Sequence, residues 1–223
     1  MAIAPGSLAF ALGQGLATGT PGEILGPSPT TFDGTSVTIV DSTGAPWAAP
    51  LIFVSPWQVT FLVPAEVAPG AAKVSVTAGG VTQSAANVQI AKVAPALYTL
   101  NGSGLAAAGA LRVSADGTQN IELAYTLNSA GSFSASPIDM GSASDNVYLQ
   151  LAGTGLQAAG TAGVKVTVGG LDAPVLFVGP QGSFGGLDQV DVQLPAALAG
   201  QGNVNVQVTA AGIAANSVQI TIK

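Results

Sequence analysis

The sequence predicts an all-β chain divided into two tandem sandwiches. Three observations predict it: apolar residues alternate with small or polar ones, turn residues separate the alternating runs, and one set of motifs occurs twice in the same order. A period of two is typical of half-buried antiparallel strands, whereas a helix repeats every ~3.6 residues. A chain of 223 residues is long enough for two domains of about 100 residues, each with its own core.

Strands are expected wherever the alternation is regular. The clearest runs are Leu8–Leu12, Val37–Ile39, Val74–Val76, Val147–Leu151, Val164–Val168 and Val204–Val208. Turn residues separate them at Asp41–Gly44, Ala68–Gly70, Ala78–Gly80 and Gly169–Gly170. Strands of about 5–7 residues with turns between them, and no helical period, favour immunoglobulin-like sandwiches.

An internal repeat is the most informative feature of the chain. Four blocks recur in order: Gly13–Leu16 as Gly153–Leu156, Ala49–Pro56 as Ala173–Pro180, Gln58–Ala65 as Gln189–Ala196, and Val88–Ile90 as Val218–Ile220. The repeat predicts two copies of one domain. Ala152 is interpreted as a one-residue insertion, a β-bulge. Phe53 and Phe177, at matched positions, are expected in the two cores.

The repeat also suggests the domain boundaries. Residues 1–95 are expected to form the first sandwich and residues 145–223 the second. Residues 96–144, which carry two turn clusters and a polar alternating stretch, are interpreted as a connection that continues into a hairpin packed on the second sandwich.

Charge limits the partners. Charged residues make up 7% of the chain and the net charge is −6, which cannot supply the basic surface that nucleic acid or an anionic membrane requires. No stretch approaches the ~20 apolar residues of a spanning helix. Low charge with many Ser, Thr, Asn and Gln residues favours an extracellular, cell-surface location.

Catalytic and cofactor chemistry find no support in the sequence. The chain has no cysteine and no histidine, which excludes hydrolytic triads built on His, disulfides and thiolate metal sites. Its glycine-rich stretches do not make a phosphate-binding loop followed by a helix. We therefore expect neither an enzyme nor a bound cofactor.

Two groups of carboxylates are candidate Ca²⁺ ligands. Asp188 and Asp191 lie three residues apart on an expected strand, so they face opposite sides and are better explained as a solvated rim. The second group is Asp139 and Asp145 in a polar loop, with Asp116 and Glu122 as candidates to lie near them in the fold. No known Ca²⁺-loop spacing is present, and Asp116-Gly117 is better explained as a turn.

Trp47 and Trp57 flank a repeated strand and form a candidate aromatic platform for carbohydrate. Packing against the sheets is the simpler explanation for both.

Sparse charge instead predicts self-association. Sandwiches leave sheet edges, which soluble proteins usually protect with Lys, Pro or bulges, and this chain has four lysines. A homopolymer joined by strand addition is expected. The candidate donor is the N-terminal segment with Met1, Ile3, Leu8, Phe10 and Leu12, or the polar hairpin between the repeats.

Several motifs together resemble a known family. They are Ala4–Ser7, Gly13-x-Gly15-Leu16, Ala49–Gln58, Ala96–Gly104, Gly153–Leu156 and Gln189–Ala196. In combination they resemble IPT/TIG-type immunoglobulin-like units, and the uncharacterised C-terminal domain family of surface or secreted proteins from Solibacter-like acidobacteria. The resemblance implies two TIG-type sandwiches, a bacterial extracellular setting and no assigned catalytic residues.

One departure from the family pattern bears on assembly. The resemblance implies an extra apolar strand before Ala4–Ser7, where only Met1–Ile3 stands. Either the sequence begins late, or the first sandwich lacks an edge strand that something else must supply. The leading hypothesis is a self-associating extracellular structural module, such as the subunit of a surface filament. The alternatives are a carbohydrate- or protein-binding accessory module and a passive spacer.

Overall fold

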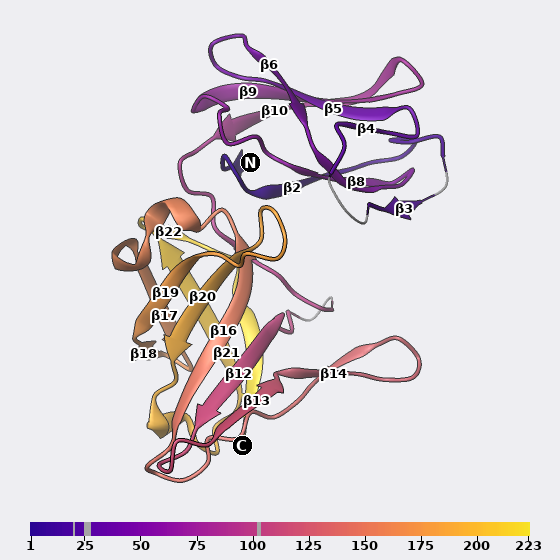
Figure 1. Cartoon of the computed structure of the whole chain (residues 1–223). Coiled ribbons are helices and arrows are strands. Elements are labelled where there is room, and N and C mark those ends of the chain that lie inside the picture. The colour runs from indigo at the N-terminus through magenta and orange to yellow at the C-terminus, as the bar shows by residue number, and fades with distance from the viewer. Residues whose placement is uncertain (20, 25–27, 102–103) are drawn as a thin grey trace. The chain divides into compact units, whose positions relative to one another are not determined.

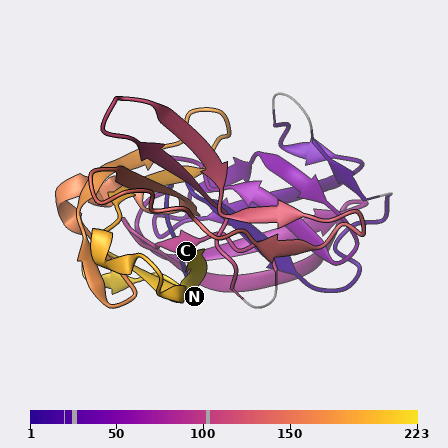
Figure 2. The ribbon, with the colours of Figure 1, turned by 90° about the horizontal axis from the view of Figure 1, so that it is seen from below.

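A computed structural model describes residues 1–19, 21–24, 28–101 and 104–223 (Figures 1 and 2). The chain forms two compact units: unit 1 is Met1–Ala94 with Ser183–Gly186, and unit 2 is Pro95–Gly182 with Leu187–Lys223. Nearly all regular structure is β, which confirms the predicted fold class. No helix within the described ranges has the length and apolar character needed to cross a bilayer.

Unit 1 is built from two sheets. The larger is six-stranded, with order β1-β10-β9-β5-β4 and β6 paired to β5; the smaller has order β2-β8-β7-β3. The strands of the larger sheet are β1 (Ala2–Ile3), β4 (Thr31–Phe32), β5 (Thr35–Val40), β6 (Pro46–Ala49), β9 (Gly70–Ala78) and β10 (Val81–Ile90). Those of the smaller are β2 (Leu8–Leu12), β3 (Gly22–Glu23), β7 (Leu51–Val54) and β8 (Gln58–Leu62).

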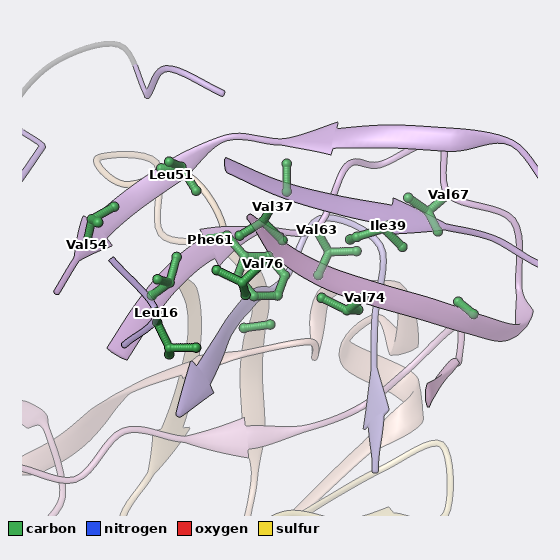
Figure 3. Packing of buried hydrophobic residues seen from close by; sticks show 14 of the residues in the cluster. Leu16, Val37, Ile39, Leu51, Val54, Phe61, Val63, Val67, Val74 and Val76 are labelled. Carbon is green, nitrogen blue, oxygen red and sulfur yellow. The ribbon is translucent and has the colours of Figure 1, made fainter. Parts of the chain in front are cut away.

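The core of unit 1 fills the space between these sheets (Figure 3). Val37 and Ile39 of β5 face Phe61 and Val63 of the other layer, and all four are almost fully buried. Leu16, from the Gly-x-Gly-Leu motif, is 1% exposed and joins the same cluster. The alternation therefore builds the core as expected along these strands.

Unit 2 has the same two-layer plan with additional strands. One sheet is six-stranded, with order β13-β12-β16-β20-β19 and β11 paired to β16; the other is five-stranded, with order β18-β17-β21-β22 and β23 paired to β21. The strands of the first are β11 (Ala96–Leu97), β12 (Ala108–Val113), β13 (Gln119–Leu123), β16 (Asn146–Thr154), β19 (Val175–Pro180) and β20 (Asp188–Gln193).

The second sheet of unit 2 has one strand fewer than the first. Its strands are β17 (Val164–Val168), β18 (Leu171–Ala173), β21 (Gly202–Ala210), β22 (Ile213–Ala214) and β23 (Val218–Ile222). Three single-turn 3₁₀ helices complete the unit: η1 (Gln157–Ala159), η2 (Thr161–Gly163) and η3 (Ala196–Leu198).

The segment 96–144 differs from the expected connection. Its strands β11, β12 and β13 are members of the six-stranded sheet, and β12 and β13 form a hairpin of that sheet. A second hairpin, β14 (Tyr125–Leu127) with β15 (Phe133–Ala135), forms a separate two-stranded sheet. It extends away from β13 in both views (Figures 1 and 2). The segment thus completes the second sandwich, because β12 supplies the ladder partner that β16 needs.

The register shows how the repeats correspond. Ala9 lies opposite Phe61 on β8, and Leu149 lies opposite Val192 on β20. Because Phe61 and Val192 are matched in the repeat, Ala9 corresponds to Leu149. The pairing of β16 with β20 runs without a break from Tyr148 to Gly153, so the bulge expected at Ala152 is wrong.

Phe177 corrects a second expectation. Its side chain is 41% exposed, and its matched partner Phe53 is only half-buried. A register shift lies just before each of them, between Leu51 and Phe53 and between Val175 and Phe177. An extra residue in the strand reverses the side chains that follow it, so Val54 and Val178 are buried instead.

Candidate assembly surface

Strand β2 turns its large side chains away from the core. Ala9 is 8% exposed, whereas Phe10 and Leu12 are 58% and 67% exposed. Successive side chains of a strand point to opposite faces, so the alanines of β2 face the core. We call the opposite side, which carries Phe10 and Leu12, the outward face of β2.

The neighbouring strands extend this apolar face. Leu62 of β8 lies opposite Leu8, and Phe53 of β7 lies opposite Thr60. Directly opposed residues share one side of a sheet. Leu8, Leu62 and Phe53 are each half-buried. An uncharged face therefore crosses β2, β8 and β7, and the loop Ser183–Gly186 of the same unit lies on it at Leu8 and Leu62.

Strand β2 also has a backbone edge that is open at Phe10 and Leu12, whereas Leu8 lies against Gly186. Val63 N–H donates to Ser7 O at 2.9 Å and Gly13 N–H donates to Trp57 O at 3.1 Å, so the odd-numbered residues bond toward β8. In an antiparallel ladder the intervening residues direct their N–H and C=O groups the other way. The backbone N–H and C=O groups of Phe10 and Leu12 thus point to the edge of the sheet, where the described residues place no strand.

The corresponding edge in unit 2 is covered. Strand β12 pairs with β16 from Ala108 opposite Leu151 to Val113 opposite Asn146, and β11 pairs with its end at Gly153 and Thr154. Leu149 and Leu151 face the core and are at most 2% exposed. Equivalent strands therefore differ both in their edge and in the direction of their large side chains.

The outward face of the six-stranded sheet in unit 2 is more polar. Gln150 and Asp191 lie opposite each other, and the Gln189 amide donates to both Asp191 carboxylate oxygens at 2.8 and 3.0 Å. Burial raises the pKa of Asp191, and the hydrogen bonds from the Gln189 amide partly offset this increase. A shallow trough of about 220 Å³ lies here, lined by Gln150, Gln189 and Tyr125 among others.

Strand β13, at the end of that sheet, is the other apolar edge. Ile121 and Leu123 are 74% and 54% exposed. They lie opposite Leu111 and Gly109 of β12, on the side away from buried Ala108 and Ala110. This stretch was expected to be a polar hairpin, whereas Ile121 and Leu123 alternate with polar residues along β13 and point outward.

The structure holds the N-terminal candidate segment within its own fold. Ala2 and Ile3 form β1, which runs parallel to β10 opposite Gln89 and Ile90. Leu8, Phe10 and Leu12 belong to β2, which is paired to β8. Met1 is 94% exposed, and its carbonyl accepts from Gln89 N–H at 3.1 Å. The segment therefore already forms two strands of unit 1. What it leaves available for contact with another chain is the edge of β2 at Phe10 and Leu12 and the outward face of that strand.

Trp47 belongs to a turn organised by Asp41. Its indole N–H donates to Asp41 Oδ2 at 2.8 Å, and the other carboxylate oxygen accepts from the Thr43 hydroxyl at 2.6 Å. Ala68 N–H adds a bond at 3.1 Å. The Thr43 hydroxyl, the Trp47 indole and the backbone donors hold the pKa of Asp41 far below its usual range.

The two tryptophans do not share a platform. Trp47 is half-buried on β6 and packs against the core, whereas Trp57 is 65% exposed in the turn before β8, in the other sheet.

Asp188 is buried, which corrects its expected place on a solvated rim. It is 1% exposed, and its carboxylate accepts from the N–H groups of Leu156 at 2.7 Å and Gln157 at 3.2 Å. Burial raises the pKa of Asp188, and these two bonds partly offset that increase. The side chain thus secures the Gly-x-Gly-Leu loop of unit 2.

The second carboxylate group is engaged by protein donors. Asp139 pairs with Arg112 at 3.2 Å and with Lys223 at 3.4 Å. Asp145 accepts from the Ser142 hydroxyl at 2.6 Å, and Asp116 accepts from Thr118 N–H at 2.9 Å. Across the residues that the structure describes, no cluster of three or more acidic side chains has the geometry to hold a metal ion.

Comparisons with known proteins give no family. No protein-family model matches the chain, and no curated protein matches it. Among solved structures, it is similar to surface layer protein SbsC, domains 4–9, with 14% identity and a TM-score of 0.28, over 99% of this chain and 29% of that one. Domains 5–6 of the S-layer protein SbsC give 13% identity and a TM-score of 0.27, covering 97% and 96%. Similarity at these values says nothing of function.

Proposed function

We propose that this chain is a non-enzymatic structural module of the bacterial cell surface and that it self-associates through its sheet edges. The observation that carries the proposal is β2, which combines an open edge with Phe10 and Leu12 exposed by 58% and 67%. Exposed apolar patches that border an unpaired strand are typical of protein–protein contacts. The IPT/TIG relationship and the extracellular location belong to the same proposal.

Weak electrostatic repulsion supports association. The net charge is −6 over 223 residues, and β2 contains no charged residue. Copies of such a chain repel one another little at physiological ionic strength, where screening acts beyond about 8 Å.

Sedimentation velocity over a wide concentration range tests the proposal. We expect the mean mass to rise with concentration and electron microscopy to show ordered polymers. A chain that stays monomeric throughout would contradict self-association and leave the passive-spacer role.

A carbohydrate-binding role is the second candidate, favoured by the trough of about 220 Å³ on unit 2. Amides and an aromatic ring are common contacts for sugars, and Gln150, Gln189 and Tyr125 line it. A glycan array probed with wild type and with Tyr125→Ala tests this role, because binding there requires the ring.

A further inference from the structure

We infer that the open edge of β2 accepts strand β13 of a second copy of this chain. The inference rests on the proposed self-association and names the two surfaces that would meet. Like β2, β13 ends its sheet and has a single ladder partner in the described part of the chain. Both strands are five residues long.

The backbone of β13 has the same free pattern as that of β2. Ser114 N–H donates to Thr118 O at 2.9 Å, and Ala124 N–H donates to Ala108 O at 3.0 Å, so the even-numbered residues of β13 bond toward β12. Ile121 and Leu123 therefore direct their N–H and C=O groups to the open edge. Two such edges can form an antiparallel ladder.

Side chains select one register for this ladder. Placing Phe10 opposite Leu123 also places Leu12 opposite Ile121, because antiparallel pairs keep a constant sum of residue numbers. These four apolar side chains are between 54% and 74% exposed in the single chain. In this register they lie on one side of the joined sheet as two cross-strand pairs, the unit of sheet stabilisation.

Neither edge carries the residues that usually prevent strand addition. No Lys, Arg or Pro occurs in β2 or β13. The one charged residue is Glu122, whose Oε1 accepts from Asp139 N–H at 2.9 Å within unit 2. The two edges can therefore meet without like-charge repulsion.

Unit 2 contains a precedent for the contact. There β12 pairs antiparallel with β16, the strand that corresponds to β2. Strand β13 of a neighbouring copy would occupy the equivalent place on β2. The order β3-β7-β8-β2 of one copy would then continue into β13-β12-β16-β20-β19 of the next.

Because the contact joins different surfaces, each copy offers one acceptor and one donor. Such a head-to-tail contact propagates into an open fibre unless the rotation between copies closes a ring. It also predicts a specific result for mixtures of two defective variants.

The experiment uses the full chain with Phe10→Lys, which blocks the acceptor, and Ile121→Lys, which blocks the donor. Each variant alone is expected to lose at least about tenfold in association constant, since an unpaired charge would be buried at the centre of the contact. An equimolar mixture is expected to form 1:1 dimers and nothing larger, because each variant keeps the surface that the other lacks.

The matched controls are Val81→Lys in unit 1 and Ile213→Lys in unit 2, which are 62% and 47% exposed and lie outside both edges. Both should assemble as wild type does, and circular dichroism checks the folding of all four variants. If wild type associates but Phe10→Lys and Ile121→Lys do so equally well, the inference is wrong while the proposed function stands. A monomeric wild type overturns both.

The register has its own test, because the chain has no natural cysteine. Mixed chains carrying Leu12→Cys and Ile121→Cys should form an interchain disulfide on mild oxidation, whereas Leu12→Cys with Leu127→Cys should not. Equal crosslinking of both mixtures would reject this register. An absent Leu12–Ile121 crosslink in polymers that do form would reject the β2–β13 contact.

Discussion

Units 1 and 2 contain equivalent strands, β2 and β16, that use opposite faces for their large residues. In β16, Leu149 and Leu151 are buried and the edge is covered by β12. In β2, Ala9 faces the core, while Phe10 and Leu12 face outward beside an open edge. A one-residue change in the phase of the apolar pattern thus turns the large side chains of this strand from the core to the exposed face.

The two units also differ at the residue that precedes the repeated glutamine, which is Gln58 in unit 1 and Gln189 in unit 2. In unit 1 it is Trp57, whose side chain is 65% exposed, and the Leu16 N–H bonds to Pro56 O at 2.9 Å. In unit 2 it is the buried Asp188, whose carboxylate accepts from Leu156 N–H at 2.7 Å. The same loop is therefore held by a backbone carbonyl in one copy and by a side chain in the other.

The two units can be followed separately in solution. Both tryptophans, Trp47 and Trp57, lie in unit 1, and the three tyrosines, Tyr98, Tyr125 and Tyr148, lie in unit 2. Tryptophan fluorescence therefore reports unfolding of unit 1. Tyrosine signals and hydrogen exchange report unit 2. Separate probes are needed because a chain of two domains need not unfold in one step.

The largest expected difference is between Leu149→Ala and Phe10→Ala. Leu149→Ala should lower the free energy of unfolding of unit 2 by about 2–5 kcal/mol, because it empties a buried site. Phe10→Ala should change unit 1 by only about 0.5 kcal/mol, as at other exposed positions. Denaturant titration of monomeric protein measures both. A loss of several kcal/mol for Phe10→Ala would show that β2 is placed with the wrong face inward.

The next comparison is between Gly153→Ala and Gly13→Ala. A Cβ at Gly153 would lie 2.7 Å from the Ala96 carbonyl oxygen of β11, whereas one at Gly13 would meet only the Leu16 side chain at 3.2 Å. Gly153→Ala should therefore cost about 1–3 kcal/mol, the range for overpacking. Gly13→Ala should cost clearly less, because a leucine side chain can move. Equal losses in the two denaturation curves would mean that the motif has the same surroundings in both units.

Asp188→Ala should destabilise unit 2 by about 1–3 kcal/mol, since buried N–H groups lose their acceptor. Asp188→Asn keeps an acceptor oxygen and removes a buried charge, so it should cost less at neutral pH. Trp57→Ala, at the corresponding position, should leave unit 1 nearly unchanged. Hydrogen exchange of the Leu156 amide measures the loop directly. If this amide is as well protected in Asp188→Ala as in Asp188→Asn, the loop does not depend on the carboxylate.

The smallest expected effect is on how the free energy of unfolding of unit 1 depends on pH. The folded-state pKa of Asp41 is lowered by the Thr43 hydroxyl and the Trp47 indole. Its contribution to stability is therefore present above the ordinary carboxyl pKa of about 4 and is lost as pH falls toward the folded value. Asp41→Asn should flatten this acid loss in tryptophan-monitored unfolding. An unchanged profile would assign the acid loss to other groups.

The sequence alone predicted much of this architecture. Alternation at Val37–Ile39 and Val204–Val208, together with the four repeated blocks, predicted strands and two related sandwiches. It also selected Leu8, Phe10 and Leu12 as residues for assembly, and their role in assembly stays a prediction. It did not predict that Asp188 would be buried, because that depends on a loop more than 30 residues earlier closing over it.

What the sequence determined is which residues share a face, since a period of two fixes that within one strand. It did not determine which face meets the core. That depends on the hydrogen-bond register with the neighbouring strand, which is equivalent in the two units and places Ala9 opposite Phe61 in β2 and Leu149 opposite Val192 in β16. The position that meets the core therefore holds an alanine in unit 1 and a leucine in unit 2. It depends also on register shifts such as the one before Phe177. Only the tertiary structure decided these, because a register is a relation between strands distant in sequence, and a shift of one residue reverses every side chain in the strand.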